Sequence, residues 1–138
     1  MFKIFLFLVL LLELGTCDGI MVIGDKNFPD MNLSKQDIKA IFLDKKRFLN
    51  NQKILAMNYE YGNELRVCFE KSILEKSQKS LERYWRKAYY KGKKPPKIIK
   101  SIEMLFSYIE SVSPSIGYID ANTTLKEDVK ILFESQCS

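Results

Sequence analysis

The sequence predicts an α/β domain, with a small and mostly parallel sheet flanked by helices. Short apolar runs alternate along the chain with longer segments whose apolar residues recur every three or four positions, and this order is typical of strands that alternate with amphipathic helices. Turn-forming residues separate the segments. A length of 138 residues, of which 46% are hydrophobic and 28% charged, is typical of one compact domain.

The first half of the chain contains two predicted strands, each followed by a predicted helix. Residues 20–23 form the first strand, and Ser34 with Asp37 forms a capping box that starts the first helix. Residues 53–57 form the second strand, which leads directly into the segment NYEYGNELR at residues 58–66. The apolar faces of the two helices are Ile38, Ile41 and Phe42, and then Leu65, Cys68, Phe69 and Ile73.

The second half contains three predicted helices and one predicted strand. Pro95 and Pro96 separate the first two helices, and residues 113–115 end the second one. Residues 116–119 form the third strand. The three apolar faces are Leu81, Tyr84, Trp85, Ala88 and Tyr89; Ile102, Leu105, Phe106 and Ile109; and Leu125, Val129, Leu132 and Phe133.

Residues 1–17 have the composition of a secretory signal peptide, which leaves residues 18–138 as the mature domain. A short positive region ends at Lys3, an apolar run covers residues 4–12, and small residues follow. The run is shorter than the roughly 20 residues that span a bilayer, so we expect no transmembrane segment after processing. A buried core helix is the alternative interpretation. Export predicts a periplasmic or secreted protein.

Two cleavage sites are compatible with this segment. Residues 14–17 resemble a bacterial lipobox, in which Cys17 would carry the lipid anchor, although Thr16 departs from the usual small residue before the cysteine. Cleavage after Cys17 would instead give a soluble form. Both routes leave Cys68 and Cys137 as an even pair in an oxidising compartment, which predicts a disulfide. Two separate reduced thiols are the alternative.

The mature part keeps the formal net charge of +5, since residues 1–17 contain one basic and one acidic residue, Lys3 and Glu13. Residues 86–100 contain no acidic residue. Basic residues interleaved with aromatic ones could bind nucleic acid. The helical spacing of the aromatic residues instead places them in the core, and export also argues against nucleic acid, so we predict no nucleic-acid partner.

The sequence gives little support for an enzyme. It contains no histidine, which excludes nucleophile pairs that use histidine and all metal sites that require it. Carboxylate pairs such as Glu127 with Asp128 and Glu60 with Glu64 are typical of a solvated helix or turn. We therefore predict no catalytic residues, no metal site and no cofactor.

Five blocks together resemble phosphate ABC transporter substrate-binding proteins. The likeness runs from about Ile20 to Asp120 and implies one lobe of the periplasmic-binding-protein fold rather than both. No single block is specific, but the order and spacing of all five are. The blocks are residues 20–27, residues 33–43, residues 58–66, Tyr84 with Trp85, and residues 115–119.

The resemblance places the ligand site at residues 59–65, where the family usually has Arg, any residue, Asp, Gly, Ser, Gly and Thr. Such a helix start offers unpaired backbone N–H groups to an oxyanion, and the arginine and hydroxyls add further donors. In this chain only Gly62 matches. The arginine, a serine and the threonine are replaced by Tyr59, Asn63 and Leu65, and Glu64 adds a negative charge at the helix start.

This pattern leaves two hypotheses open. In the first, the chain is a solute-binding module that holds a small anion such as phosphate weakly or not at all, at a site formed by Tyr59, Gly62, Asn63, Glu64 and Arg66. In the second, Gly62 only permits a tight turn that Asn63 caps, and the module docks a protein or an anionic lipid surface through residues 91–100 or an apolar edge. The resemblance implies an ABC transporter permease or another envelope protein as partner.

Overall fold

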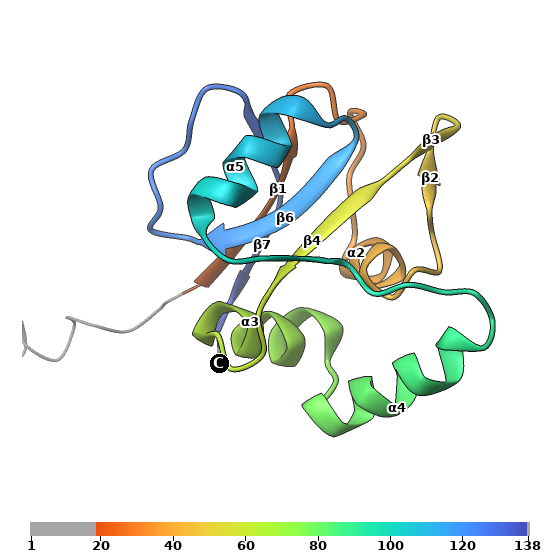
Figure 1. The fold of residues 1–138 in the computed structure, drawn as a ribbon. Coiled ribbons are helices and arrows are strands. Elements are labelled where there is room, and N and C mark those ends of the chain that lie inside the picture. Colours follow the sequence, from red (N-terminus) through yellow and green to blue (C-terminus); the bar gives the residue numbers. More distant parts are fainter. Residues whose placement is uncertain (1–18, 138) are drawn as a thin grey trace, which may run out of the picture.

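The computed structural model describes residues 19–137, which fold around a five-stranded sheet in the order β5-β4-β6-β1-β7 (Figure 1). The neighbours β5, β4 and β6 pair in parallel, whereas β1 lies antiparallel between β6 and β7. Four of the five strands therefore run in one direction, which confirms the mostly parallel sheet. The strands are β1 (Gly19–Asp25), β4 (Leu55–Tyr59), β5 (Lys97–Ile99), β6 (Ser115–Asp120) and β7 (Val129–Gln136), and β2 (Phe48–Leu49) and β3 (Gln52–Lys53) form a separate hairpin.

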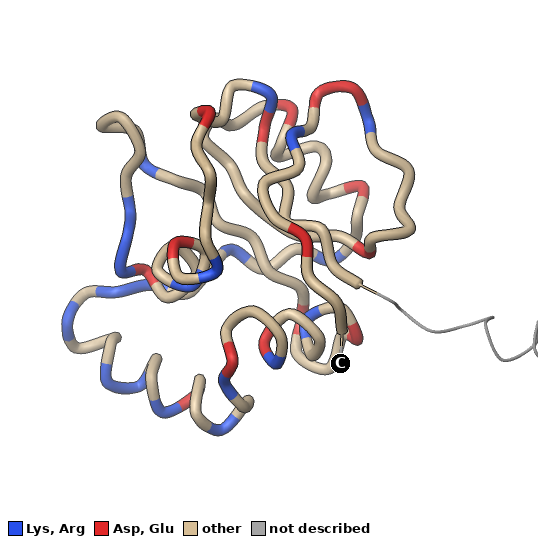
Figure 2. The backbone as a smooth tube through the Cα atoms, turned by 180° about the vertical axis from the view of Figure 1, so that it is seen from behind, with Lys and Arg blue, Asp and Glu red and all other residues tan. Residues whose placement is uncertain are grey.

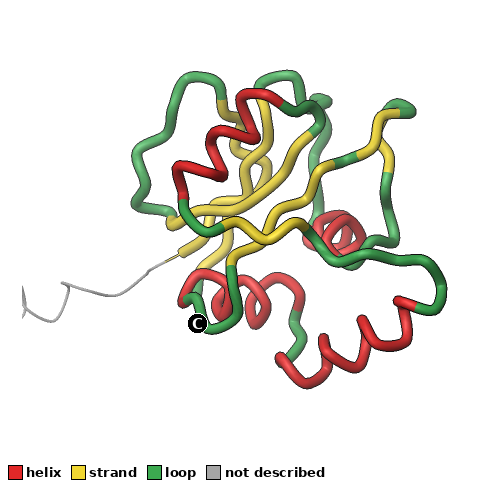
Figure 3. Tube along the Cα trace, in the orientation of Figure 1, coloured by secondary structure: helices red, strands yellow, loops and turns green. Residues whose placement is uncertain are grey.

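Helices cover both faces of the sheet (Figures 1 and 3), as adjacent residues of β6 demonstrate. A Cβ atom at Gly117 would lie 2.5 Å from Leu105, so this residue faces α5. The next residue, Tyr118, stacks on Phe69 of α3 with ring centroids 4.0 Å apart. Because successive strand residues point to opposite faces, α5 and α3 lie on opposite sides of the sheet. The helices are α2 (Lys35–Phe42), α3 (Glu64–Phe69), a π-helix (Glu70–Leu74), α4 (Gln78–Tyr89) and α5 (Ile102–Ser111).

A serine side chain caps the first turn of three helices, α2, α4 and α5. Ser34 accepts a hydrogen bond from the Asp37 N–H, and the Asp37 carboxylate accepts one from the Ser34 N–H, which confirms the capping box. Ser77 and Ser101, which were not identified as caps from the sequence, accept hydrogen bonds from the N–H groups of Ser80 and Met104 and cap α4 and α5 without a reciprocal bond. These local bonds satisfy N–H groups that have no partner within the helix, which is why the start of α2 could be predicted from the sequence.

The prediction of a final helix through Leu125, Val129, Leu132 and Phe133 is wrong, because residues 129–136 form the strand β7. In the pairing with β1, Val22 lies opposite Phe133 and Ile23 opposite Ile131, so Leu132 is an extra residue in a β-bulge. The bulge interrupts the alternation of apolar and polar residues that is typical of a strand. The apolar residues therefore recur at the three- and four-residue spacing of a helix. The short strand β5 was also missed, since three residues carry no clear period.

The prediction that the aromatic stripe of α4 points into the core holds only in part. Leu81 and Ala88 are buried, and Tyr84 and Trp85 are half-buried. Tyr89 is 75% exposed, so the prediction is wrong for this residue. It lies at the last position of α4 and, although the preceding Ala88 is buried, none of the described residues covers its ring.

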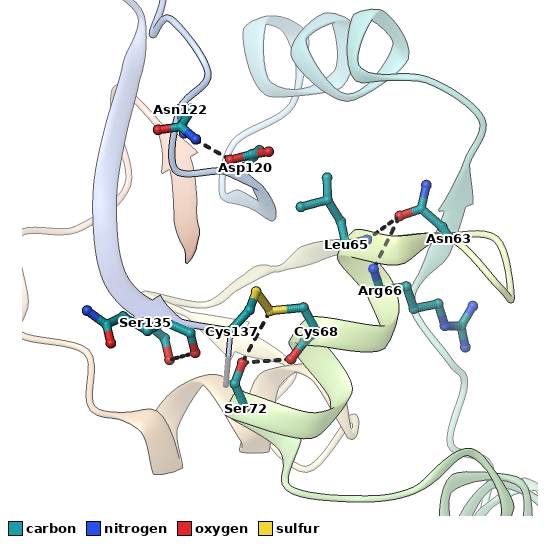
Figure 4. The surroundings of a disulfide bond; sticks show 10 residues. Asn63, Leu65, Arg66, Cys68, Ser72, Asp120, Asn122, Ser135 and Cys137 are labelled. Carbon is teal, nitrogen blue, oxygen red and sulfur yellow. Dashed lines mark hydrogen bonds between the residues drawn. A yellow bond between two sulfur atoms is a disulfide. The ribbon is translucent and has the colours of Figure 1, made fainter. Parts of the chain in front are cut away.

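A disulfide joins Cys68 of α3 to Cys137, which follows β7 (Figure 4). The two Cα atoms lie 5.4 Å apart although 69 residues separate them in the sequence. The bond therefore fastens the edge strand of the sheet to the helix layer. Within residues 19–137, no helix is long and apolar enough to cross a membrane. The predicted signal peptide, its cleavage sites and Cys17 lie outside the described residues.

Candidate functional site

The predicted site lies at the carboxyl end of β4, where a tight turn connects this strand to α3. The turn is closed by a hydrogen bond from the Asn63 N–H to the Glu60 carbonyl, at 3.2 Å. Gly62 has a φ of +84°, a backbone conformation that residues with a Cβ atom rarely adopt. The turn therefore requires glycine for its backbone shape, whether or not a ligand binds there.

The side chain of Asn63 accepts hydrogen bonds from the N–H groups that a bound anion would otherwise contact. Its amide oxygen accepts hydrogen bonds from the backbone N–H of Leu65 at 2.8 Å and of Arg66 at 3.2 Å (Figure 4). An amide side chain at this position is a common helix cap. In this chain the cap stands where the resemblance places the phosphate, so an incoming anion has to displace it.

Arg66 is directed into the protein instead of toward the exposed turn. Its guanidinium donates to the Glu70 carboxylate from Nε at 2.8 Å and to the Tyr59 carbonyl at 2.7 Å. The Tyr61 ring covers it, with the ring centroid 3.8 Å from the guanidinium carbon. Both members of the ion pair are buried, with exposed fractions of 6% for Arg66 and 7% for Glu70. The guanidinium is therefore already bound within the protein.

Tyr59, which stands where the family has its arginine, is a core residue. Its hydroxyl donates to the Tyr118 carbonyl at 2.9 Å, and the two rings meet edge to face. Burial raises the pKa of Tyr59 to about 12. Burial also raises the pKa of Tyr118 well above its usual value. Both phenols are therefore neutral at physiological pH and bring no charge to the site.

A buried polar network lies beneath the turn and was not found from the sequence. The Asn58 side-chain oxygen accepts hydrogen bonds from the Tyr118 hydroxyl and from the Tyr59 N–H. Asn58 is the one side chain of this network that a sequence could indicate, because it interrupts an otherwise apolar strand. Tyr118 and Glu70 give no such signal, since their roles depend on contacts between distant segments.

The remaining predicted site residue, Glu64, is exposed in the first turn of α3. Its carboxylate stands at the positive end of the helix dipole, where it stabilises the helix and repels a second anion. Within residues 19–137, no group of three or more Cys, Asp or Glu side chains is placed to hold a metal ion. The turn thus combines a filled cap, an inward arginine and an unfavourable charge.

A small cavity lies beside the turn, between α3, α4 and the segment before β5. Asn58, Tyr61, Arg66 and Glu70 supply its polar lining, and Trp85 is among the apolar residues opposite them. Its volume is about 190 Å³, whereas typical small-molecule pockets have roughly 300–1,000 Å³. The cavity is therefore large enough only for a very small ligand.

Two solved structures with bound or transported phosphate in their descriptions are similar to this chain. The first is a protein assigned as a phosphate ABC transporter substrate-binding protein from Clostridium perfringens, with bound phosphate (TM-score 0.65, 22% identity, 83% of this chain and 44% of that chain). The second is an ABC-type phosphate transport receptor from Vibrio cholerae (TM-score 0.61, 16% identity, 83% and 45%). No protein-family model matches the chain, and no curated protein matches it.

These similarities define the class of fold. The domain is an α/β structure whose fold is similar to one lobe of a periplasmic-binding protein. This chain spans less than half the length of either one. At such low identity the likeness concerns the fold alone, so the function must be argued from the site.

Proposed function

We propose that this chain is a non-enzymatic, solute-binding-type module with a degenerate anion site, which binds phosphate weakly or not at all. One observation carries the proposal: the Asn63 amide oxygen accepts hydrogen bonds from the Leu65 and Arg66 N–H groups. The helix start that would hold an oxyanion is thus satisfied from within the chain.

The surrounding charges favour the same conclusion. A phosphate at the turn would have to displace the Asn63 cap and approach the Glu64 carboxylate. Arg66 could compensate only by leaving Glu70, and an uncompensated charge in a buried pair costs about 3–5 kcal/mol. A charge-assisted hydrogen bond contributes roughly 1.5–3 kcal/mol, which is too little to offset that loss.

The proposed place of action is the cell envelope or its exterior, in a soluble form or a form anchored through Cys17. Two-lobed binding proteins close around their ligands, whereas this domain corresponds to one lobe. A second surface would have to complete any enclosed site, and an ABC transporter permease or another envelope protein is the kind of partner we propose. The single exposed turn alone cannot enclose an ion.

The proposal is tested by restoring donors at the turn. In the triple variant Asn63→Ser, Glu64→Gly and Leu65→Thr, the cap is shortened, the negative charge is removed and a hydroxyl is added. Tyr59 remains unchanged, because an arginine would break its buried hydrogen bond to Tyr118. In calorimetry at fixed ionic strength, we expect phosphate binding at least tenfold tighter in the triple variant, a gain of about 1.4 kcal/mol.

Micromolar phosphate affinity in the unaltered protein would contradict the proposal. Absence of any gain in a folded triple variant would favour the second candidate function, an interaction module that has lost its ligand. One observation supports that candidate: Tyr89 and Tyr90 are 75% and 86% exposed, in contact with each other, beside a basic segment (Figure 2). Exposed tyrosines among lysines suit a protein or anionic lipid surface.

A further inference from the structure

A second and larger hollow lies at the amino end of β4 and shares Pro95 and Pro96 with the small cavity beside the Gly62 turn. It has a volume of about 540 Å³ and lies between the loop after α2, the start of β4 and residues 92–97, which lead from α4 into β5. We call it the connector pocket. Because β4 and β5 are parallel, the pocket lies at their amino ends, whereas the Gly62 turn follows the carboxyl end of β4.

The lining of the connector pocket is strongly cationic. Five basic residues line it, namely Lys46, Arg47, Lys53, Lys94 and Lys97, together with one carboxylate, Asp44. Asp44 already pairs with Arg47 at 3.0 Å. In the described part of the chain, none of the four lysines forms an ion pair with a carboxylate. The pocket therefore has an excess of positive charge that its own residues do not neutralise.

The walls of the connector pocket are fixed by hydrogen bonds between its two loops. Arg47 donates to the Gly92 carbonyl at 3.0 Å, and the Lys93 ammonium donates to the Asp44 carbonyl at 3.1 Å. The Lys94 N–H donates to the Asp44 carboxylate at 2.9 Å. Asp44 thus links the two loops through its backbone carbonyl and its carboxylate. Among the lining lysines, Lys97 also has its ammonium 5.2 Å from the centroid of the Tyr108 ring. A preformed site loses less entropy on binding than a flexible loop.

The lining also contains apolar surface. Ile41 and Ile54 are buried residues that contribute to it, and Leu55, Ala56, Pro95 and Pro96 lie beside them. A volume of this size falls within the range of roughly 300–1,000 Å³ that is typical of small-molecule sites. Apolar residues with a few convergent charged groups are the usual composition of such sites. A bare inorganic ion would leave the apolar part uncovered.

We propose that the connector pocket binds a small organic anion that carries two negative charges on an aromatic or other apolar body. The charged group contacts the lysines, above all Lys53 and Lys94, and the body covers the isoleucine and proline side chains. None of residues 59–66 lines this site, so the inference does not depend on the proposed function of the Gly62 turn.

The test uses 4-nitrophenyl phosphate, an aromatic dianion, titrated into the protein in a calorimeter at fixed ionic strength. We expect a saturable isotherm for the unaltered protein, and binding at least tenfold weaker for inorganic phosphate and for uncharged 4-nitrobenzyl alcohol. The double variant Lys53→Glu and Lys94→Glu should lose at least tenfold in affinity, because two positive charges that would contact the phosphate group are replaced by negative ones.

A matched control separates the pocket from general charge effects. The double variant Lys79→Glu and Lys87→Glu changes the net charge equally on exposed residues of α4 that do not line the pocket. It should bind the probe within about threefold of the unaltered protein, as expected for screened charges outside the site. The triple variant at the Gly62 turn should also keep its affinity. Equal losses in both lysine variants, or no saturable binding in the unaltered protein, would overturn the proposal.

Discussion

At the scale of single residues, the turn after β4 depends on how Asn63, Arg66 and Tyr59 direct their polar atoms. The Asn63 amide oxygen accepts hydrogen bonds from N–H groups at the start of α3. The Arg66 guanidinium donates to the Glu70 carboxylate and the Tyr59 carbonyl, and the Tyr59 hydroxyl donates to the Tyr118 carbonyl. The Asn63 amide oxygen, the Arg66 guanidinium and the Tyr59 hydroxyl therefore each have a partner inside the domain. The residues that differ from the phosphate-binding pattern thereby gain a structural role.

The first prediction concerns the buried ion pair. Replacing Arg66 by Met leaves the Glu70 carboxylate buried without its partner, which should lower the free energy of unfolding by about 3–5 kcal/mol. The double variant Arg66→Met and Glu70→Met should recover most of this loss, because both desolvation costs are removed. Urea denaturation measures both values. A single variant as stable as the double one would contradict the structural role of the pair.

The second prediction concerns pH. Burial raises the pKa of Tyr59 to about 12, whereas an unfolded tyrosine has a pKa near ~10. As the pH rises, the unfolded chain therefore loses this proton before the folded one does. The contribution of Tyr59 to the free energy of unfolding is complete below pH ~10 and is lost between pH ~10 and ~12. Tyr59→Phe should reduce the fall, measured by urea denaturation across this range. An identical fall in the variant would show that Tyr59 does not contribute.

Some of these residue roles were predictable and others were not. Gly62 and the cap at Asn63 follow from local turn and helix rules, and both appear as expected. The inward position of Tyr59 could not be predicted, because its partner Tyr118 lies 59 residues later in the chain. The same holds for the Arg66 contact with the Tyr59 carbonyl, which depends on how the strand and helix meet.

At the scale of elements, the edge strand β7 and helix α3 are held together by the disulfide. Cys137→Ser should remove about 2–4 kcal/mol of stability, because the bond closes a long loop in the unfolded chain. For a domain of this size, such a loss lowers the melting temperature by several degrees, and differential scanning calorimetry measures it. Peptide mapping without reductant should find the Cys68 and Cys137 peptides linked. Two alkylated thiols at these positions in the native protein would contradict the prediction.

The elements also show where sequence patterns are insufficient. Strands β1, β4 and β6 and helices α2 to α5 follow from apolar periodicity and capping residues. β7 was predicted as a helix, because the bulge at Leu132 places two apolar residues side by side. Its strand identity is decided by pairing with β1 at the far end of the chain. Tertiary pairing therefore outweighs the local pattern there.

At the scale of the whole molecule, the first question is export. If residues 1–17 are a signal peptide, mass spectrometry of protein from the native host should find no peptide that contains residues 4–12. An acylated Cys17 at the mature N-terminus would identify a lipoprotein, and Asp18 at that place a soluble form. A mature protein that retains Met1 would contradict export in both forms.

The described domain is similar in fold to one lobe of a periplasmic-binding protein, and basic residues are gathered along α4 and the segment that follows it (Figure 2). The polar groups at the two ends of β4 differ in whether they have partners within the domain. At the Gly62 turn the Leu65 and Arg66 N–H groups donate to the Asn63 side chain, whereas the lysines of the connector pocket form no ion pair with a carboxylate of the described residues.

The central claim is that the N–H groups at the start of α3 donate hydrogen bonds to the Asn63 side chain and not to a phosphate ion. The most direct measurement is a titration of ¹⁵N-labelled protein with phosphate at fixed ionic strength, which follows the amide resonances of residues 62–66. We predict no saturable shift of these resonances at micromolar phosphate, because the Asn63 oxygen already accepts from Leu65 and Arg66. Saturable shifts of the Leu65 and Arg66 amides at micromolar phosphate would contradict the claim.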